Sequence, residues 1–144
     1  MAVNTQKVVV GGLAAGVTLL VLGYPVYFMW LGPRLTAEMD ALLPGKSAAM
    51  MAGATNMAIN FGGQFVIGLL LAFLYAAMRP RFGAGMKTAV YAALVVWIAG
   101  LVFYAPSLQM GTMSTTSYMM ASCAALVLNV VAAAVAGMLY TEAA

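Results

Sequence analysis

Four long apolar stretches, separated by short polar segments, dominate the chain. They cover about residues 8–31, 57–78, 88–105 and 116–140. In a helix, about 20 apolar residues match the roughly 30 Å thickness of the hydrocarbon core of a bilayer. The strands of a membrane barrel would instead be about 10 residues long, with alternating polarity. The pattern therefore predicts an all-α, polytopic membrane protein with four transmembrane helices in a single domain.

Prolines and aromatic rings mark the end of the first stretch. Its last residues are rich in aromatic rings, which favour the membrane interface, and Gly32 and Pro33 follow. Pro25 lies inside the stretch and lacks a backbone N–H, which predicts a kink. In the next loop, residues 33–43 have an apolar and a polar side, so we expect a short helix along the membrane surface, either a connector or a lid or docking surface. The first stretch exceeds the roughly 7 to 15 apolar residues of a signal peptide, so we expect it to remain.

Charge is scarce, and its scarcity narrows the function classes. The 144 residues include six Lys or Arg, three Asp or Glu and no His, and 65% are hydrophobic. General bases, zinc ligands and haem ligands are therefore few, and we expect neither an enzyme nor a cofactor. Glu38 and Asp40 fit a solvated helix face better than a catalytic pair, and Cys123 has no cysteine partner within the chain. No carboxylate is predicted within the membrane, which argues against proton-coupled transport.

The cations set the expected orientation. With the N-terminus inside, the cytoplasmic face carries Lys7, Arg79, Arg81 and Lys87, against two cations outside. The positive-inside rule then places both termini in the cytoplasm. Arg79, Arg81 and Lys87 share one short loop, where we expect contact with the headgroups of membrane lipid. Three side chains are too small a basic surface for nucleic acid, which we do not expect as a partner.

The two halves of the chain show a similar order of motifs. Gly23 and Tyr27 are four residues apart near the end of the first helix, as are Gly100 and Tyr104 in the third. A Leu-Tyr pair ends the second helix and another ends the fourth, each with an amide 11 residues before the tyrosine. These matches predict a two-helix tandem repeat about an axis along the membrane normal. Chance similarity between apolar segments is the alternative.

Amide side chains are the main polar groups inside the predicted spans. Asn56, Asn60 and Gln64 share a face of the second helix, and Asn129 on the fourth is their natural hydrogen-bond partner. An unpaired amide in hydrocarbon costs several kcal/mol, so the stripe must face another helix, another chain or water. Hydrogen bonds between helices explain it without a ligand, and the alternative is a small-molecule site or a pore lining.

Small residues and methionines are the remaining candidates. Small residues at helical spacing indicate faces where helices pack closely, within the chain or between chains. They are Gly12, Gly16, Gly63, Gly68, Ala133 and Gly137. Methionine thioethers are soft Cu(I) ligands, although they also fill apolar gaps. Four around the second outer loop form the candidate metal site, namely Met110, Met113, Met119 and Met120.

The hydropathy profile as a whole resembles that of a family of small four-helix bacterial inner-membrane proteins. The resemblance rests on the aromatic exit from Gly23 to Tyr27, on Pro33 and on four spans within 144 residues. It implies a location in the bacterial cytoplasmic membrane and assigns no site residues. Three hypotheses for the function remain. The first is a non-enzymatic subunit that forms a homo-oligomer or joins a larger membrane complex; the others are a small channel or carrier for a neutral solute and extracytoplasmic Cu(I) binding by methionines.

Overall fold

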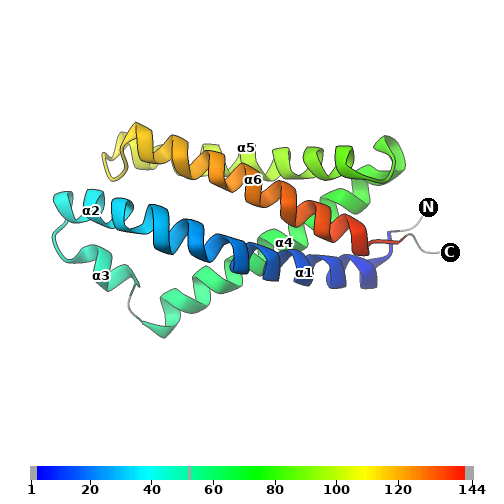
Figure 1. Cartoon of the computed structure of the whole chain (residues 1–144), viewed down its shortest axis with the longest axis horizontal. Helices are drawn as coiled ribbons and strands as arrows, with labels where there is room; N and C mark the ends of the chain where they lie inside the picture. Colours follow the sequence, from blue (N-terminus) through cyan, green and yellow to red (C-terminus); the bar gives the residue numbers. More distant parts are fainter. Residues whose placement is uncertain (1–2, 52, 142–144) are drawn as a thin grey trace.

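The computed structural model describes residues 3–51 and 53–141, which form helices joined by short turns. In chain order the elements are α1 (Thr5–Tyr24), the π-helix η1 (Pro25–Leu31), α2 (Gly32–Leu42), α3 (Lys46–Met51), α4 (Ala54–Phe82), α5 (Met86–Gln109) and α6 (Thr115–Leu139). Both described chain ends and the α4–α5 turn lie at one end of the bundle, here called the terminal end (Figure 1). Helices α2 and α3 and the α5–α6 loop lie at the other, the loop end (Figure 1).

Four helical segments are long and apolar enough to cross a membrane. They are Thr5–Leu42, Ala54–Phe82, Met86–Gln109 and Thr115–Leu139. The first three contain the predicted spans, and the fourth ends one residue before the predicted end at residue 140. No strand occurs among the residues that the structure describes. The predicted all-helical fold is therefore confirmed.

Local sequence explains where several helices begin and end. The Asn4 side chain accepts a hydrogen bond from the Lys7 N–H at 3.2 Å and so caps the start of α1. Ser114 caps α6 in the same way. The turn between α4 and α5 contains Gly83 and Gly85 at φ 85° and 124°, a backbone region that favours glycine.

The first span and the expected surface helix form one continuous helix rather than two separate elements. Helices α1, η1 and α2 run without a break over the 38 residues Thr5–Leu42 (Figure 1). The residues expected to form a short helix, about 33–43, are helical as predicted, but they continue the first helix instead of starting anew after a loop. The break that we expected at Gly32 and Pro33, between the first span and the surface helix, does not occur.

A π-helical turn explains how the first helix continues past a proline. Pro25 has no N–H to donate to the carbonyl of Val21, which would interrupt an α-helix. In η1 the N–H groups bond five residues back instead of four, so the turn accommodates the proline. Gly32 follows this turn, and a Cβ there would lie 2.6 Å from the carbonyl oxygen of Tyr27. Glycine is therefore required where the π-turn returns to α-helix.

The core lies in the half of the bundle nearer the terminal end, where small residues bring helix backbones together. A Cβ on Gly68 of α4 would overlap the backbone of both Gly12 and Gly16 on α1. A Cβ on Gly11 would lie 3.0 Å from the carbonyl oxygen of Ala136 on α6. Such close approach gives dense van der Waals contact without large side chains. The buried alanines of this core include Ala15, Ala72, Ala132, Ala133 and Ala136.

Toward the loop end, α4 leaves the bundle. Its residues 54–62 are all exposed apart from the half-buried Asn56, and in Figure 1 this part of the helix diverges from α1. A Cβ added at Gly62 or Gly63 would have no atom of another element within 4 Å. The first and last helices stay together, since the Tyr27 hydroxyl donates to the Ala121 carbonyl at 3.3 Å. The bundle is thus closed at the terminal end and open around α4 at the loop end.

The two-helix repeat stays a prediction. The two tyrosines that end the second and fourth spans, Tyr75 and Tyr140, are both buried, and their rings meet edge to face 6.3 Å apart. The other matched motifs have different surroundings. Gly23 is buried against Tyr27 and α6, whereas Gly100 has open space around it and Tyr104 is 66% exposed.

Candidate functional site

A polar cluster joins α2 to the start of α6 at the loop end. Glu38 accepts hydrogen bonds from the Ser114 N–H at 2.9 Å, the Ser114 hydroxyl at 2.7 Å and the Ser117 hydroxyl at 2.6 Å. Arg34, one turn earlier on α2, lies 3.4 Å from the same carboxylate, and its Nε donates to the Ser117 hydroxyl at 2.7 Å. An anion is favoured at the N-terminus of a helix, so Glu38 reinforces the cap that Ser114 provides.

The hydrogen bonds around Glu38 make it a structural carboxylate rather than a general base. The backbone and hydroxyl bonds from Ser114 and Ser117 lower its pKa from 4.5 to about 2. A continuous 38-residue helix is about 57 Å long, well beyond the roughly 30 Å of hydrocarbon, so Glu38 near its end extends past any span. Asp40 has a different serine partner, Ser47, which donates its N–H at 3.2 Å and its hydroxyl at 2.5 Å.

The predicted amide stripe lies on the part of α4 that leaves the bundle. Asn60 is exposed, and its Nδ2 donates to the carbonyl of Asn56 one turn earlier at 2.9 Å. Gln64, a further turn along, is half-buried where α4 rejoins the other helices. Gly63 shares this face, because residues three apart are neighbours on a helix. The stripe therefore combines amide side chains with a glycine, Gly63, at which another backbone could approach closely.

Asn129 is the one predicted amide that α6 carries into the core. It is 8% exposed, and within the described residues no hydrogen bond joins it to Asn60 or Gln64. The physical reason lies in the path of α4, which diverges from the bundle along the stretch that holds the stripe. Among the hydrogen bonds of the described residues, Asn60 and Gln64 therefore do not show the pairing with the fourth helix that the sequence predicted.

The predicted packing residues occupy two kinds of environment. Gly12 and Gly16 pack against α4, and Gly68 packs against both of them. Gly137 packs on the ring of Tyr75, because a Cβ added at Gly137 would lie 2.6 Å from the nearest ring atoms. Ala133 is fully buried. Gly63 differs from these residues because the space around it is open. Contacts within the chain thus account for every predicted small residue except the one in the amide stripe.

Of the four predicted methionine ligands, Met119 and Met120 line a common groove. Met110 is 74% exposed, and neither it nor Met113 lines the groove that contains the other two. That groove, of about 410 Å³, lies between η1 and α6, and its walls are almost wholly apolar. Side chains with soft or aromatic character line it, namely Trp30, Met119, Met120 and Cys123. In this groove the sulfur ligands for a soft metal ion would be Met119, Met120 and Cys123.

Tyrosines organise the terminal end. The Tyr75 hydroxyl accepts a hydrogen bond from the Gly85 N–H at 2.9 Å, which fixes the turn between α4 and α5. The Tyr140 hydroxyl accepts from the Asn4 N–H at 3.3 Å, which ties the two described chain ends together. Arg79 lies 5.5 Å from the centre of the Tyr140 ring and donates to the Tyr140 carbonyl at 3.5 Å.

The three predicted headgroup ligands therefore differ in their surroundings. Arg79 is half-buried against Tyr140, whereas Arg81 is exposed. Lys87 is exposed too, with its Nζ 5.9 Å from the centre of the Tyr91 ring. All three remain at the same end of the bundle.

Sequence reasoning missed the polar cluster at the loop end. It treated Glu38 as part of a solvated face and did not connect it to the Ser-Thr run before the fourth span. Ser114 followed by Ser117 resembles the start of a capped helix, which was a usable signal. The contact with Glu38 has no local signal, because 76 residues separate Glu38 from Ser114.

Comparisons with protein-family models, with curated proteins and with solved structures found no match for this chain.

Proposed function

We propose that this protein is a non-enzymatic integral membrane protein that works as a homo-oligomeric subunit, with its copies joined through the amide stripe of α4. The observation that carries the proposal is the exposure of Asn60 on an apolar helix. In hydrocarbon, an amide group that lacks a hydrogen-bond partner costs roughly 2 kcal/mol or more. A neighbouring chain would remove this cost.

A second copy of the chain suits this face better than a charged partner. An amide both donates and accepts, so two identical stripes complement each other across a twofold axis. The Nδ2 of Asn60 donates one hydrogen to the carbonyl of Asn56, and among the described residues its Oδ1 and second hydrogen make no other hydrogen bond. No Lys, Arg, Asp or Glu occurs in residues 54–67. Gly63 lies on the same face and lets two backbones approach closely.

The charges support a cytoplasmic-membrane location with both termini inside. Lys7 on α1 and the α4–α5 turn lie at the terminal end, together with Arg79, Arg81 and Lys87 (Figure 1). The cations of the loop end are Arg34 and Lys46. The positive-inside rule then favours a cytoplasmic terminal end, as in the bacterial inner-membrane proteins that the chain resembles. Labelling of single cysteines from either side of the membrane would test this orientation.

The oligomer can be tested by counting subunits in lipid nanodiscs or bilayers by native mass spectrometry or photobleaching. We expect wild type to form oligomers and Asn60→Leu to raise the dissociation constant about tenfold or more, since each interhelical bond contributes roughly 0.6 to 1.7 kcal/mol and a twofold axis doubles it. Ile59→Leu is the matched control, because Ile59 is the next residue, is 67% exposed and lies off the stripe. It should assemble like wild type.

Cysteine cross-linking locates the contact. In a Cys123→Ala background, Asn60→Cys should form cross-linked dimers at high protein density in the membrane. Ala58→Cys should not, because residues two apart point to opposite sides of a helix. A chain that stays monomeric at every density, or an Asn60→Leu variant that assembles like wild type, would overturn the proposal. Assembly only with a different protein would overturn it in favour of an accessory subunit.

A further inference from the structure

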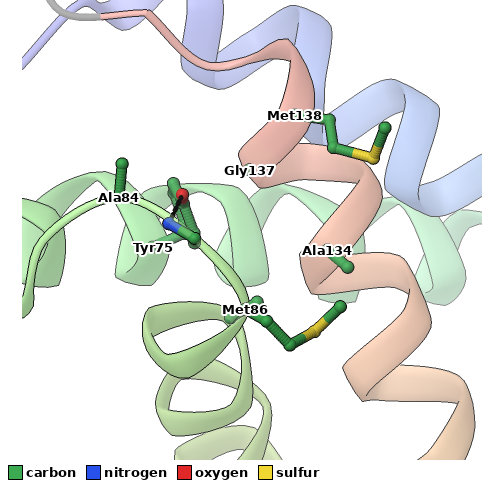
Figure 2. Close-up of a pocket in the computed structure, with 8 residues that line it drawn as sticks. Tyr75, Ala84, Met86, Ala134, Gly137 and Met138 are labelled. Carbon is green, nitrogen blue, oxygen red and sulfur yellow. Dashed lines mark hydrogen bonds between the residues drawn. The ribbon is translucent and has the colours of Figure 1, made fainter.

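A second apolar cavity lies at the terminal end, among α4, α5 and α6. Its volume is about 280 Å³, and it opens to the outside of the bundle. Figure 2 shows Tyr75 at one side of it, Ala134 and Gly137 of α6 at another, and Ala84 in the turn above. Met86 and Met138, 61% and 83% exposed, flank it. Most of its lining is apolar.

The walls of this cavity are held in place by specific contacts. The hydrogen bond between the Gly85 N–H and the Tyr75 hydroxyl, drawn as a dashed line in Figure 2, fixes the turn. Thr88 strengthens the same turn, since its hydroxyl donates to the Gly83 carbonyl at 2.6 Å. Gly137 packs directly on the Tyr75 ring. The space is therefore formed by packed backbone and a fixed tyrosine ring, and binding a ligand needs little rearrangement.

Positive charge surrounds the same turn. Lys87 directly follows Met86, a lining residue, and Arg81 lies three residues before Ala84, within about 11 Å along the chain. Both cations are exposed. The two carboxylates within the described residues, Glu38 and Asp40, are on α2 at the opposite end of the bundle. The terminal end thus presents an apolar cavity whose lining turn is flanked in sequence by two exposed cations.

We propose that this cavity binds one anionic phospholipid, with an acyl chain between α5 and α6 and the phosphate near Lys87 and Arg81. An apolar cavity takes hydrocarbon, and adjacent cations select an anionic headgroup, so the two features together fit an amphiphile. A free phosphate ion would use the cations but leave the cavity empty. A neutral lipid would fill the cavity but gain nothing from the cations. The site rests on the membrane location proposed above and is independent of the amide stripe.

Lipid retention measured by native mass spectrometry tests the site. The protein in neutral detergent is titrated with phosphatidylglycerol or phosphatidylcholine of the same acyl composition. We expect wild type to retain one phosphatidylglycerol in preference to phosphatidylcholine. The Arg81→Gln, Lys87→Gln double variant should lower the affinity for phosphatidylglycerol about tenfold or more and leave phosphatidylcholine unchanged. Lys46→Gln, at the loop end, is the control for loss of charge.

Filling the cavity should weaken the binding of both lipids. Ala134→Phe places a ring in the cavity, and Met86→Trp narrows its mouth at an exposed position that does not disturb the core. Ala124→Phe, in the groove beside Trp30, is the control for added bulk. Equal retention of the two lipids by wild type, or unchanged retention of phosphatidylglycerol by both cavity variants, would overturn the site. A wild-type protein that forms oligomers but binds the two lipids equally would reject this site alone, whereas loss of oligomers on Asn60→Leu concerns only the amide stripe.

Discussion

The two halves of α4 belong to one helix but have opposite surroundings. In the half nearer the terminal end, Gly68 meets the backbone of α1, and Leu71, Ala72, Tyr75 and Ala76 are buried. In the half nearer the loop end, residues 54–62 are exposed apart from the half-buried Asn56, and Gly62 and Gly63 have open space around them. The helix is continuous through both halves, so the difference arises from what packs against it and not from its own conformation.

This comparison shows that small residues have a role only where a neighbouring backbone reaches them. Gly68 and Gly63 lie on the same helix, five residues apart, and pattern analysis treats them alike. One is enclosed by its own chain and the other is open. The closed half explains why the monomer folds, and the open half carries the amides that we propose for assembly.

We expect the largest loss of stability from a substitution in the half of α4 nearer the terminal end. Gly68→Ala adds a Cβ that would overlap the backbone of Gly12 and Gly16, and backbone atoms cannot move aside as a side chain can. We expect a loss of roughly 1–3 kcal/mol or more in the free energy of unfolding. Unfolding by SDS titration in mixed micelles, followed by tryptophan fluorescence, measures it.

Gly62→Ala is the matched control in the open half. An added Cβ there meets no atom of another element within 4 Å, and alanine favours helix over glycine by up to about 1 kcal/mol. We expect unchanged or slightly greater stability. Equal destabilisation by the two substitutions would show that the two halves of α4 do not differ in packing.

A smaller effect concerns the loop end away from α4, where Glu38 holds the start of α6. Glu38→Gln keeps the shape but removes the charge that accepts three hydrogen bonds, and we expect a loss of about 1–2 kcal/mol at pH 7, reduced by partial exposure. The pKa of Glu38 is lowered from 4.5 to about 2, so its stabilisation is complete above pH 4.5 and is lost as the pH falls through 2.

The difference in melting temperature between wild type and Glu38→Gln should therefore stay constant from pH 5 to pH 8 and shrink below about pH 4.5. Thermal unfolding in detergent across this range measures the difference. A gap that widens on acidification, or no gap at pH 7, would contradict the structural role assigned to this carboxylate.

The smallest effect is expected at the α4–α5 turn. Tyr75→Phe removes the hydroxyl that accepts from the Gly85 N–H, and we expect a loss of about 1 kcal/mol. Tyr91→Phe is the control, because the Tyr91 ring makes its contacts with Phe82 and Lys87 through its faces and edges. Chemical unfolding of both variants against wild type measures the difference, which would vanish if the turn were held without this bond.

Sequence patterns predicted the helices well because each depends on local properties. Apolar length predicted them, and the caps at Asn4 and Ser114 and the glycines of the α4–α5 turn, which the structure added, also act within a few residues of the element they define. At Pro25 the pattern predicted a kink but not the π-helical turn that the chain forms there. It failed at Glu38, whose partners are more than 70 residues away.

The sequence by itself determined that the chain is helical, that four of its helical segments are long and apolar enough to cross a membrane, and where its charges fall. These follow from hydropathy and local backbone preference, which act along the chain. The tertiary structure decided which glycines are enclosed, which serines Glu38 contacts, that Asn129 is buried while Asn60 is exposed, and that a cavity forms among α4, α5 and α6. Those outcomes depend on the crossing of helices far apart in sequence, because a helix pattern fixes which residues share a face but not which neighbour that face meets.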